Sequence, residues 1–258
     1  LDCLVVLGGN GSQKTANLLS EEGLNVIGLP KTIDNDLWGT DTTFGFQSAI
    51  GLATEVIDCI HTTAASHNRV FMVEIMGHKA GWLTLNAGIA GGADIILIPE
   101  IPYNIDSVIA KIRQRAASGN GFTILAVAEG AISQKEAAMS KKEYKQHMAE
   151  VLEKYPSVSY AIADKILKKT GKEVRVTVPG HMQRGGAPCA YDRVLSSRLG
   201  TTAALMISRD EYGSMVAIQN HVITSVPLKE IAGKLKTIDP KSDIITEARL
   251  LGISFGDD

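Results

Sequence analysis

The sequence predicts an α/β fold in which largely parallel β-sheets are flanked by helices. Short apolar runs alternate along the chain with segments whose apolar residues recur every three or four positions, as on one face of a helix. Most of the runs are nearly continuous in apolar residues, which is typical of parallel strands buried on both faces and joined by right-handed helical crossovers. The 258 residues, 45% of them hydrophobic, are enough for one large or two modest domains.

The start of the chain predicts a strand–helix–strand unit. Residues 4–7 are apolar and end at two glycines, so they are expected to form a buried strand. Residues 13–22 predict a helix, and the apolar run 26–29 predicts the next strand. Because a proline and a polar run follow, residues 30–36 are expected to form a loop at the end of this strand.

The middle of the chain continues the alternation. In residues 47–66 the apolar side chains recur at steps of three and four, which predicts a long helix with one apolar face. The apolar runs 70–75, 95–98 and 123–128 predict three strands, and a helix is expected over 105–117 between the last two.

Residues 131–156 break this rhythm, because they are polar and rich in lysine and glutamate. They either remodel an interface or extend a surface helix, and the surface helix is the favoured interpretation. A helix is expected after this segment, ending before Gly171, and the run 174–178 predicts another strand. Near the end, the spacing of apolar residues over 231–238 predicts one more amphipathic helix.

The bulk composition excludes several classes of protein. A formal net charge of -2 and a pI near 6.3 argue against a nucleic-acid surface, which needs a basic excess. The three cysteines lie far apart without C-x-x-C spacing, as is typical of a reducing cytoplasm. No apolar run reaches the roughly 18 residues of a membrane span, and no basic segment precedes the first strand. We therefore expect a cytoplasmic protein without a signal peptide, membrane association or nucleic-acid partner.

A glycine-rich segment, Gly8-Gly9-Asn10-Gly11-Ser12, lies between the first strand and the first helix. Glycine lets backbone N–H groups approach a phosphate closely, and a helix N-terminus adds a favourable dipole. The alternative is a tight turn capped by Ser12, and the motif by itself leaves the two interpretations even. Its predicted nucleotide-binding residues are Gly9, Asn10, Gly11 and Ser12.

Two carboxylates beside a lysine follow the second strand. Asp34 is the candidate to accept a hydroxyl proton, and Asp36 is expected to fix the loop or to contact a metal-bound water. Lys31 is expected to neutralise charge on a transferring phosphoryl group. The alternative is a pair of solvated turn aspartates and a surface lysine. The polar, glycine-punctuated residues 39–43 favour function, because long polar loops between apolar elements are commonly functional.

Five motifs resemble those of the phosphofructokinase family, and they span about the first three quarters of the chain. In the order of the family they are Gly8-Gly9-Asn10-Gly11-Ser12, Pro30-Lys31-Thr32-Ile33-Asp34-Asn35-Asp36, Gly39-Thr40-Asp41-Thr42-Thr43-Phe44-Gly45-Phe46, Glu74-Ile75-Met76-Gly77-His78 and Gly180-His181-Met182-Gln183-Arg184-Gly185-Gly186. The second and fifth motifs are highly specific, and Pro188 with Asp192-Arg193 extends the fifth.

The resemblance implies two Rossmann-like lobes. Residues 1–46 and 188–258 are expected to form the lobe on the nucleotide side, and residues 47–187 the lobe on the sugar-phosphate side. The family's first strand, a phosphate-binding glycine loop and an upstream arginine have no counterpart in the sequence given. We therefore expect that the N-terminal portion of the first lobe is missing from this chain.

The resemblance also implies the activity, which is phosphoryl transfer from ATP, with Mg²⁺, to the 1-hydroxyl of fructose 6-phosphate in glycolysis. Asp34 matches the family's catalytic base, Thr32 lies beside it, and Asp36 matches the second loop aspartate. Asn10 stands where the family usually has an aspartate associated with the nucleotide-bound magnesium. Asparagine keeps an oxygen ligand but loses a charge, so direct metal binding should be weaker.

The resemblance also implies which residues bind the sugar phosphate. Met76, Gly77 and Glu129 match residues that hold the sugar, and His181 and Arg184 match the sugar-phosphate site. Arg69 and Arg175 match arginines that reach the neighbouring subunit's site, which implies a homodimer or homotetramer with shared active sites. The residues alone also allow plainer roles: surface charge for the two arginines, a buried structural histidine for His181, and a helix-capping carboxylate for Glu129.

Two positions bear on the phosphoryl donor. In this family a glycine at Gly11 accompanies ATP, whereas an aspartate accompanies pyrophosphate, because a carboxylate there repels the α-phosphate. Lys31 is usual in the pyrophosphate enzymes, but the combination with Gly11 occurs in ATP-using branches, so ATP is favoured. A pyrophosphate-dependent enzyme remains the first alternative. A non-catalytic regulatory subunit that binds sugar phosphates is the second, favoured by Asn10 and disfavoured by retention of Asp34. His78 also departs from the arginine common in well-known bacterial members.

Overall fold

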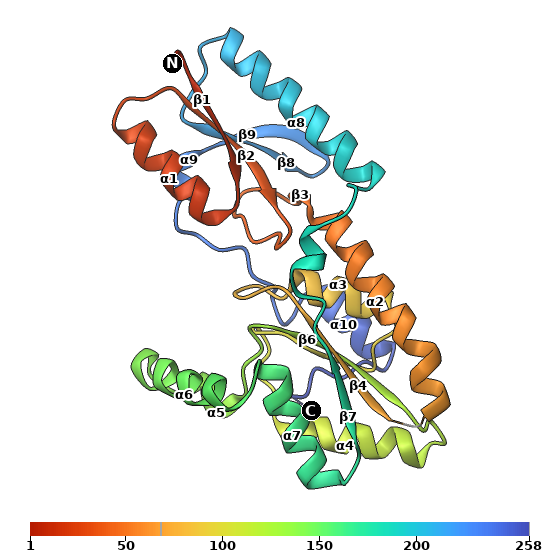
Figure 1. Cartoon of the computed structure of the whole chain (residues 1–258). Coiled ribbons are helices and arrows are strands. Elements are labelled where there is room, and N and C mark those ends of the chain that lie inside the picture. The colour runs from red at the N-terminus through yellow and green to blue at the C-terminus, as the bar shows by residue number, and fades with distance from the viewer. Residues whose placement is uncertain (68, 258) are drawn as a thin grey trace. The chain divides into compact units, whose positions relative to one another are not determined.

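The computed structural model describes residues 1–67 and 69–257, which divide into two compact units (Figure 1). Unit 1 consists of Leu1–Ala49 and Gly186–Thr237, and unit 2 of Ile50–Gly185 and Ile238–Asp258. Each unit has its own β-sheet, covered by helices. The predicted α/β class is confirmed.

Unit 1 contains a sheet in the order β1-β2-β8-β9, with β3 also paired to β2. All its pairings are parallel except that of β8 with β9, which form an antiparallel hairpin. Its strands are β1 (Leu4–Gly8), β2 (Val26–Thr32), β3 (Phe44–Gly45), β8 (Ser214–Gln219) and β9 (Val222–Pro227). Its helices are α1 (Asn10–Glu21), α8 (Ala190–Ser208), α9 (Leu228–Ile231) and the first turn of α2 (Phe46–His67).

Alternating side chains of β2 bury both faces of this sheet. Ile27 and Leu29 pack with the buried residues of α8, whereas Val26 packs with α1 and α9 on the other face. A strand buried on both sides reads as a continuous apolar run, which is why residues 26–29 were recognisable in the sequence. This sandwich fixes the positions of the two loops that leave β1 and β2.

Unit 2 contains a fully parallel sheet in the order β5-β6-β4-β7. Its core includes apolar side chains of β4 and β6 packed against α4 and α7. Its strands are β4 (Val70–Ile75), β5 (Ile95–Leu97), β6 (Thr123–Ala128) and β7 (Val174–Thr177). Its helices are most of α2, α3 (Trp82–Ala90), α4 (Ile105–Ala117), α5 (Gln134–Ala137), α6 (Lys141–Lys154), α7 (Val158–Thr170), the 3₁₀ helix η1 (Gly180–Arg184) and α10 (Asp243–Leu250).

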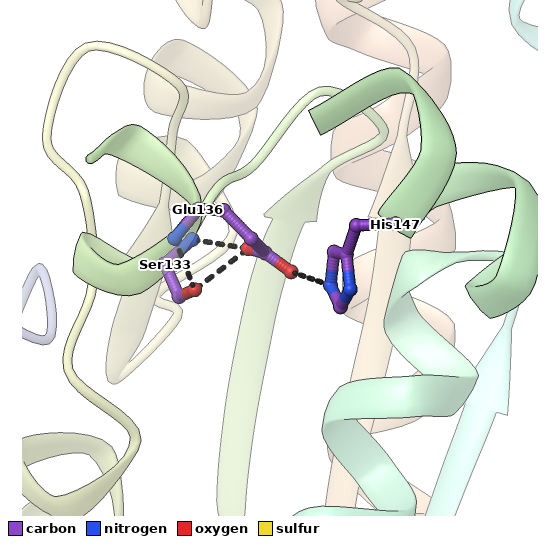
Figure 2. Close-up of polar contacts among 3 residues, drawn as sticks. All are labelled: Ser133, Glu136 and His147. Atoms are coloured by element: carbon purple, nitrogen blue, oxygen red, sulfur yellow. Dashed lines mark hydrogen bonds and ion pairs between the residues drawn. The ribbon is translucent and has the colours of Figure 1, made fainter. Parts of the chain in front are cut away.

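The polar segment 131–156 folds into α5 and α6, and both helices begin with a capping box. Ser133 and Glu136 form the first box, and Ser140 and Glu143 form the second. The ring of His147 on α6 bonds to the other carboxylate oxygen of Glu136 at 3.1 Å and so links the two helices (Figure 2). No residue of α6 is fully buried, which agrees with the predicted surface helix.

Three predicted elements differ from the structure by more than one residue. β2 continues through Lys31 to Thr32, because Pro30 pairs with the last residue of β1 and the next two residues pair with β3. α1 begins three residues earlier than expected, at Asn10. The helix predicted over 231–238 does not form: α9 ends at Ile231, and Leu235 then forms an antiparallel bridge with Leu37.

The C-terminal residues 238–258 were expected in the first lobe, but they belong to unit 2. Ser254 extends the sheet beside β5: its carbonyl accepts a bond from Ile96 N at 2.9 Å, and its N–H donates to Asp94 O at 3.1 Å. This placement depends on backbone hydrogen bonds, and the sequence of the segment contains no motif that predicts it. In the residues described, no helix is both long and apolar enough to cross a membrane.

Candidate active site

The glycine loop of unit 1 lies at the carboxyl ends of β1 and β2. Gly9 is the N-cap of α1 and no side chain caps the helix, so the predicted capping by Ser12 is wrong. A Cβ at Gly9 would lie 3.3 Å from the Cβ of Thr32, so glycine permits this close approach of the two loops. The first turn of α1 contains no acidic residue, which leaves its N–H groups and dipole for an external anion.

Asn10, the first residue of α1, is held by its own side chain. Its Nδ2 donates to the carbonyl of Lys234 at 2.7 Å, in the segment that follows α9. The amide nitrogen is therefore used in the fold, and Oδ1 is the oxygen that this side chain offers to a ligand. Gly11 and Ser12 are exposed beside it.

The candidate catalytic loop, residues 32–43, is fixed by side-chain bonds to its own backbone. The N–H of Asp34 donates to Thr32 Oγ1 at 3.2 Å, and Thr32 Oγ1 lies 3.5 Å from Asp34 Oδ2. Asn35 has a left-handed φ of 51°, is 4% exposed, and accepts a bond from Thr43 N at 3.1 Å. The two aspartates on either side of it are half-buried. Solvated turn aspartates would need none of this support.

Lys236, which lies far along the chain, also contacts this loop, although sequence reasoning missed it. Its Nζ donates to Asn35 Oδ1 at 3.0 Å, to Thr40 O at 2.9 Å and to Asp41 O at 2.8 Å. Burial lowers its pKa from 10.5 to about 8, against the opposing effect of the nearby aspartates Asp41 and Asp36. Nothing in a Lys-Leu-Lys sequence distinguishes a buried lysine from a surface one. Lys31, in contrast, is exposed at the end of β2.

The predicted sugar-binding residues of unit 2 gather at the carboxyl ends of neighbouring parallel strands. Met76 and Gly77 follow β4, and Glu129 follows β6. Gly77 N donates to Glu129 Oε1 at 3.3 Å, so Glu129 supports the neighbouring loop rather than capping a helix. Ligands of α/β sheets bind at this edge.

Gln183, 2% exposed, brings η1 to the same edge of the sheet. Its Oε1 accepts a bond from Met76 N at 3.1 Å, and its Nε2 donates to Gly180 O at 3.2 Å. The structure therefore places His181 and Arg184, which are both exposed, at the end of the sheet that carries Met76. The alternative of a buried structural histidine at 181 is wrong. The motif contained Gln183, but sequence reasoning gave it no role.

Arg69 and Arg175 lie at the other end of this sheet, just before β4 and near the start of β7. Both form ion pairs with Glu173, at 3.0 Å from Arg69 Nε and 2.6 Å from an Arg175 guanidinium nitrogen. The structure thus does not bring these arginines together with Glu129. The structure therefore does not support a role for Arg69 and Arg175 in the sugar site of their own chain. Their predicted role in the site of a neighbouring subunit stays a prediction.

A cleft of about 810 Å³ lies within unit 2, between the ends of β4 and β6 and the segment α5–α7. Glu129 and His78 lie at one side, and Tyr144, Lys145 and Met148 of α6 at the other. The bond between His147 and Glu136 fixes α6 relative to α5 (Figure 2). Of the predicted sugar-binding residues, Glu129 lines this cleft, whereas Met76, Gly77, His181 and Arg184 are not among its lining residues.

The loop after β6 packs closely against the loop after β4, and a substitution at Gly130 tests this contact. A Cβ on Gly130 would overlap the carbonyl oxygen of His78. Gly130→Ala is therefore expected to destabilise the protein by about 1–3 kcal/mol, as overpacking does. Gly51→Ala is the control, because a Cβ on this exposed helical glycine meets nothing within 4 Å; it should stabilise by about 0.5–1 kcal/mol. Urea unfolding midpoints that move equally for both variants would contradict this packing.

Comparison with known proteins identifies the family of the chain. A family model described as Phosphofructokinase matches residues 1–207. The ATP-dependent 6-phosphofructokinase of Spirochaeta thermophila is 55% identical over 257 residues, which cover 100% of this chain and 70% of that protein. The ATP-dependent 6-phosphofructokinase of Propionibacterium freudenreichii is 46% identical over 272 residues, covering 100% of this chain and 73% of that protein.

A solved structure agrees as well. The crystal structure of Pichia pastoris phosphofructokinase in the T-state has a TM-score of 0.73 and 33% identity, covering 90% of this chain and 27% of the much longer Pichia chain. The matched region of the family model includes the glycine loop, the loop with Asp34, Glu129 at the end of β6, and η1 with Arg184. This chain therefore belongs to the phosphofructokinase family.

Proposed function

We propose that this chain catalyses phosphoryl transfer from ATP to the 1-hydroxyl of fructose 6-phosphate, giving fructose 1,6-bisphosphate. The observation that carries the proposal is the braced loop in which Asp34 and Asp36 lie beside the glycine loop of α1. Two relatives, at 55% and 46% identity over the whole chain, are named ATP-dependent 6-phosphofructokinases. This reaction assigns the protein a place in glycolysis and, with it, a cytoplasmic location.

On the donor side, the N-terminus of α1 binds phosphates of ATP through the backbone of Gly11 and Ser12. No group of three or more His, Cys, Asp or Glu side chains in the described residues is arranged to hold a metal ion. Magnesium in nucleotide sites usually needs one or two protein oxygens besides phosphates and water. Asn10 Oδ1 fits such a cation arriving with ATP, and the cation would offset charge on the transferring group.

On the acceptor side, Glu129 and the backbone of Gly77 hold the sugar, and His181 and Arg184 hold its 6-phosphate. The forked donors of an arginine suit a phosphate dianion, and a histidine ring nitrogen can donate a further hydrogen bond. Asp34 accepts the proton of the 1-hydroxyl as that oxygen attacks the γ-phosphorus, and Lys31 offsets charge on the transferred group. Thr32 orients Asp34 through the bond to its N–H, and Asp36 fixes the loop. Arg69 and Arg175 serve a neighbouring subunit's 6-phosphate, in a homodimer or homotetramer.

Pyrophosphate is the second candidate donor, and the observation that favours it is Lys31. This exposed lysine lies at the end of β2 next to the loop of Asp34, where it can reach a small anionic donor. Gly11 opposes this, because no carboxylate stands at the first turn of α1 to exclude an α-phosphate.

Steady-state assays of the full-length protein with fructose 6-phosphate and Mg²⁺ test the proposal, with ATP and pyrophosphate compared as donors. Turnover with ATP and none with pyrophosphate is the expected result. Turnover with pyrophosphate alone would reverse the donor and keep the acceptor. Binding of fructose 6-phosphate without turnover on either donor would identify a regulatory subunit.

A further inference from the structure

The ammonium group of Lys236 is held by several oxygen acceptors of the candidate catalytic loop. A lysine ammonium has three N–H donors, and Nζ of Lys236 has three oxygen acceptors at 2.8–3.0 Å in Asn35, Thr40 and Asp41. The residue itself is half-buried, between α9 and the C-terminal part of the chain. A surface lysine has no such fixed set of partners.

These three bonds join both ends of the candidate catalytic loop. Asn35 is the residue between the two aspartates, whereas Thr40 and Asp41 lie at the far end of the loop. The backbone N–H of Lys236 adds a fourth bond, to the carbonyl of Asp36 at 2.9 Å. Lys236 therefore holds the backbone carbonyls of Asp36, Thr40 and Asp41 together with the side chain of Asn35, which lies between the two aspartates.

We propose that Lys236 is a positioning residue for phosphoryl transfer, which holds the segment of Asp34 and Asp36 in its reactive geometry without touching either substrate. The inference rests on the proposed function. Positioning of this kind is expected to matter for kcat, because a displacement of about 1 Å in a reacting group can lower the rate about 10²-fold.

The protonation state of Lys236 links its loop bonds to the pH dependence of activity, which can be measured. Its carboxylate neighbours are Asp36 and Asp41, and burial nevertheless lowers its pKa to about 8. The neutral amine has two donors instead of three, so one of the three loop bonds is lost as the pH rises through this range. Activity is therefore expected to fall above about pH 8.

As the pH rises, the stability contribution of Lys236 is expected to increase while the activity falls. Because folding lowers the pKa of Lys236 from 10.5 to about 8, the unfolded chain binds more protons between these two values. The contribution of Lys236 to the free energy of unfolding therefore rises with pH in this window. Loss of kcat with retained stability separates a loosened loop from general alkaline unfolding.

The test compares Lys236→Met, Lys236→Arg and the control Lys229→Met in the full-length protein. Met has similar length but no donors, Arg keeps the charge, and Lys229 is an exposed residue of α9. We expect Lys236→Met to lower kcat about 10- to 10²-fold with both KM values within about twofold. Lys236→Arg should recover part of this loss and move the alkaline limb to higher pH, and Lys229→Met should match the wild type.

A wild-type kcat in Lys236→Met, or an alkaline limb unchanged in Lys236→Arg, would overturn the inference. If Lys236→Met does not fold, the pH profile of Lys236→Arg decides. An inactive wild-type protein would overturn the proposed function, whereas an active wild type with an equally active Lys236→Met variant would overturn only the role of Lys236.

Discussion

Asp34→Asn is expected to lower kcat about 10²- to 10⁴-fold, the usual cost of removing a positioned general base. The substitution preserves the shape of the side chain, and the bond from the N–H of residue 34 to Thr32 Oγ1 involves only the backbone of that residue. The loop should therefore keep its conformation, and KM for fructose 6-phosphate should stay within about twofold of the wild type. Steady-state kinetics with ATP and Mg²⁺ measure both constants.

Asp2→Asn is the matched control, because it removes the same charge from an exposed position of unit 1. It is expected to have wild-type kinetics. A kcat of Asp34→Asn close to that of the control would show that another group accepts the proton. A large rise in KM with little change in kcat would instead assign Asp34 to substrate binding.

Gly11→Asp is expected to lower kcat/KM for ATP about 10- to 10³-fold. A carboxylate about 4 Å from a phosphate repels it by about 1 kcal/mol in water and about 4 kcal/mol near a protein surface, and about 1.4 kcal/mol is a factor of ten. The fold should tolerate the change, because a Cβ at Gly11 meets nothing within 4 Å. A carboxylate in the first turn of α1 should even stabilise the helix by about 0.3–1 kcal/mol.

Gly11→Asn separates charge from size, because the two side chains have nearly the same shape. It should use ATP far better than Gly11→Asp, while both variants keep the thermal stability of the wild type or exceed it. Equal kcat/KM values for ATP in the two variants would show that charge at this position does not select the donor. Parallel assays with pyrophosphate show whether the preference has reversed.

The sequence predicted most of the strands that are buried on both faces, but it missed β8, whose Met215, Val216 and Ala217 are fully buried. Residues 70–75 and 123–128 are apolar except for Glu74 and Thr123, and β4 and β6 have these bounds. α3 was missed because residues 82–90 are apolar on every side, so no helical period is visible. The hairpin partner of β8, which is β9, was also missed, because the strand 222–227 lies at the edge of the sheet and is mixed in character.

The residues of the candidate site were predictable where they lie just after the ends of strands. Motif residues such as Gly77 and Glu129 come directly after apolar runs, and parallel strands bring such ends to one edge. Lys236 and Gln183 were not predictable as supporting residues, because their partners lie more than 100 positions away along the chain. Hydrogen bonds of that kind depend on the folded backbone and leave no local pattern in the sequence.

The position of the new phosphate in the product tests the account most directly. The full-length protein would be incubated with Mg·ATP and fructose 6-phosphate labelled with ¹³C at carbon 1, and the product examined by ³¹P and ¹³C NMR. We predict a second phosphate whose ³¹P signal is coupled to the labelled carbon, formed together with ADP, and absent with Asp34→Asn on the same time scale. A phosphate on a different hydroxyl, or release of inorganic phosphate from ATP without sugar phosphorylation, would contradict the account.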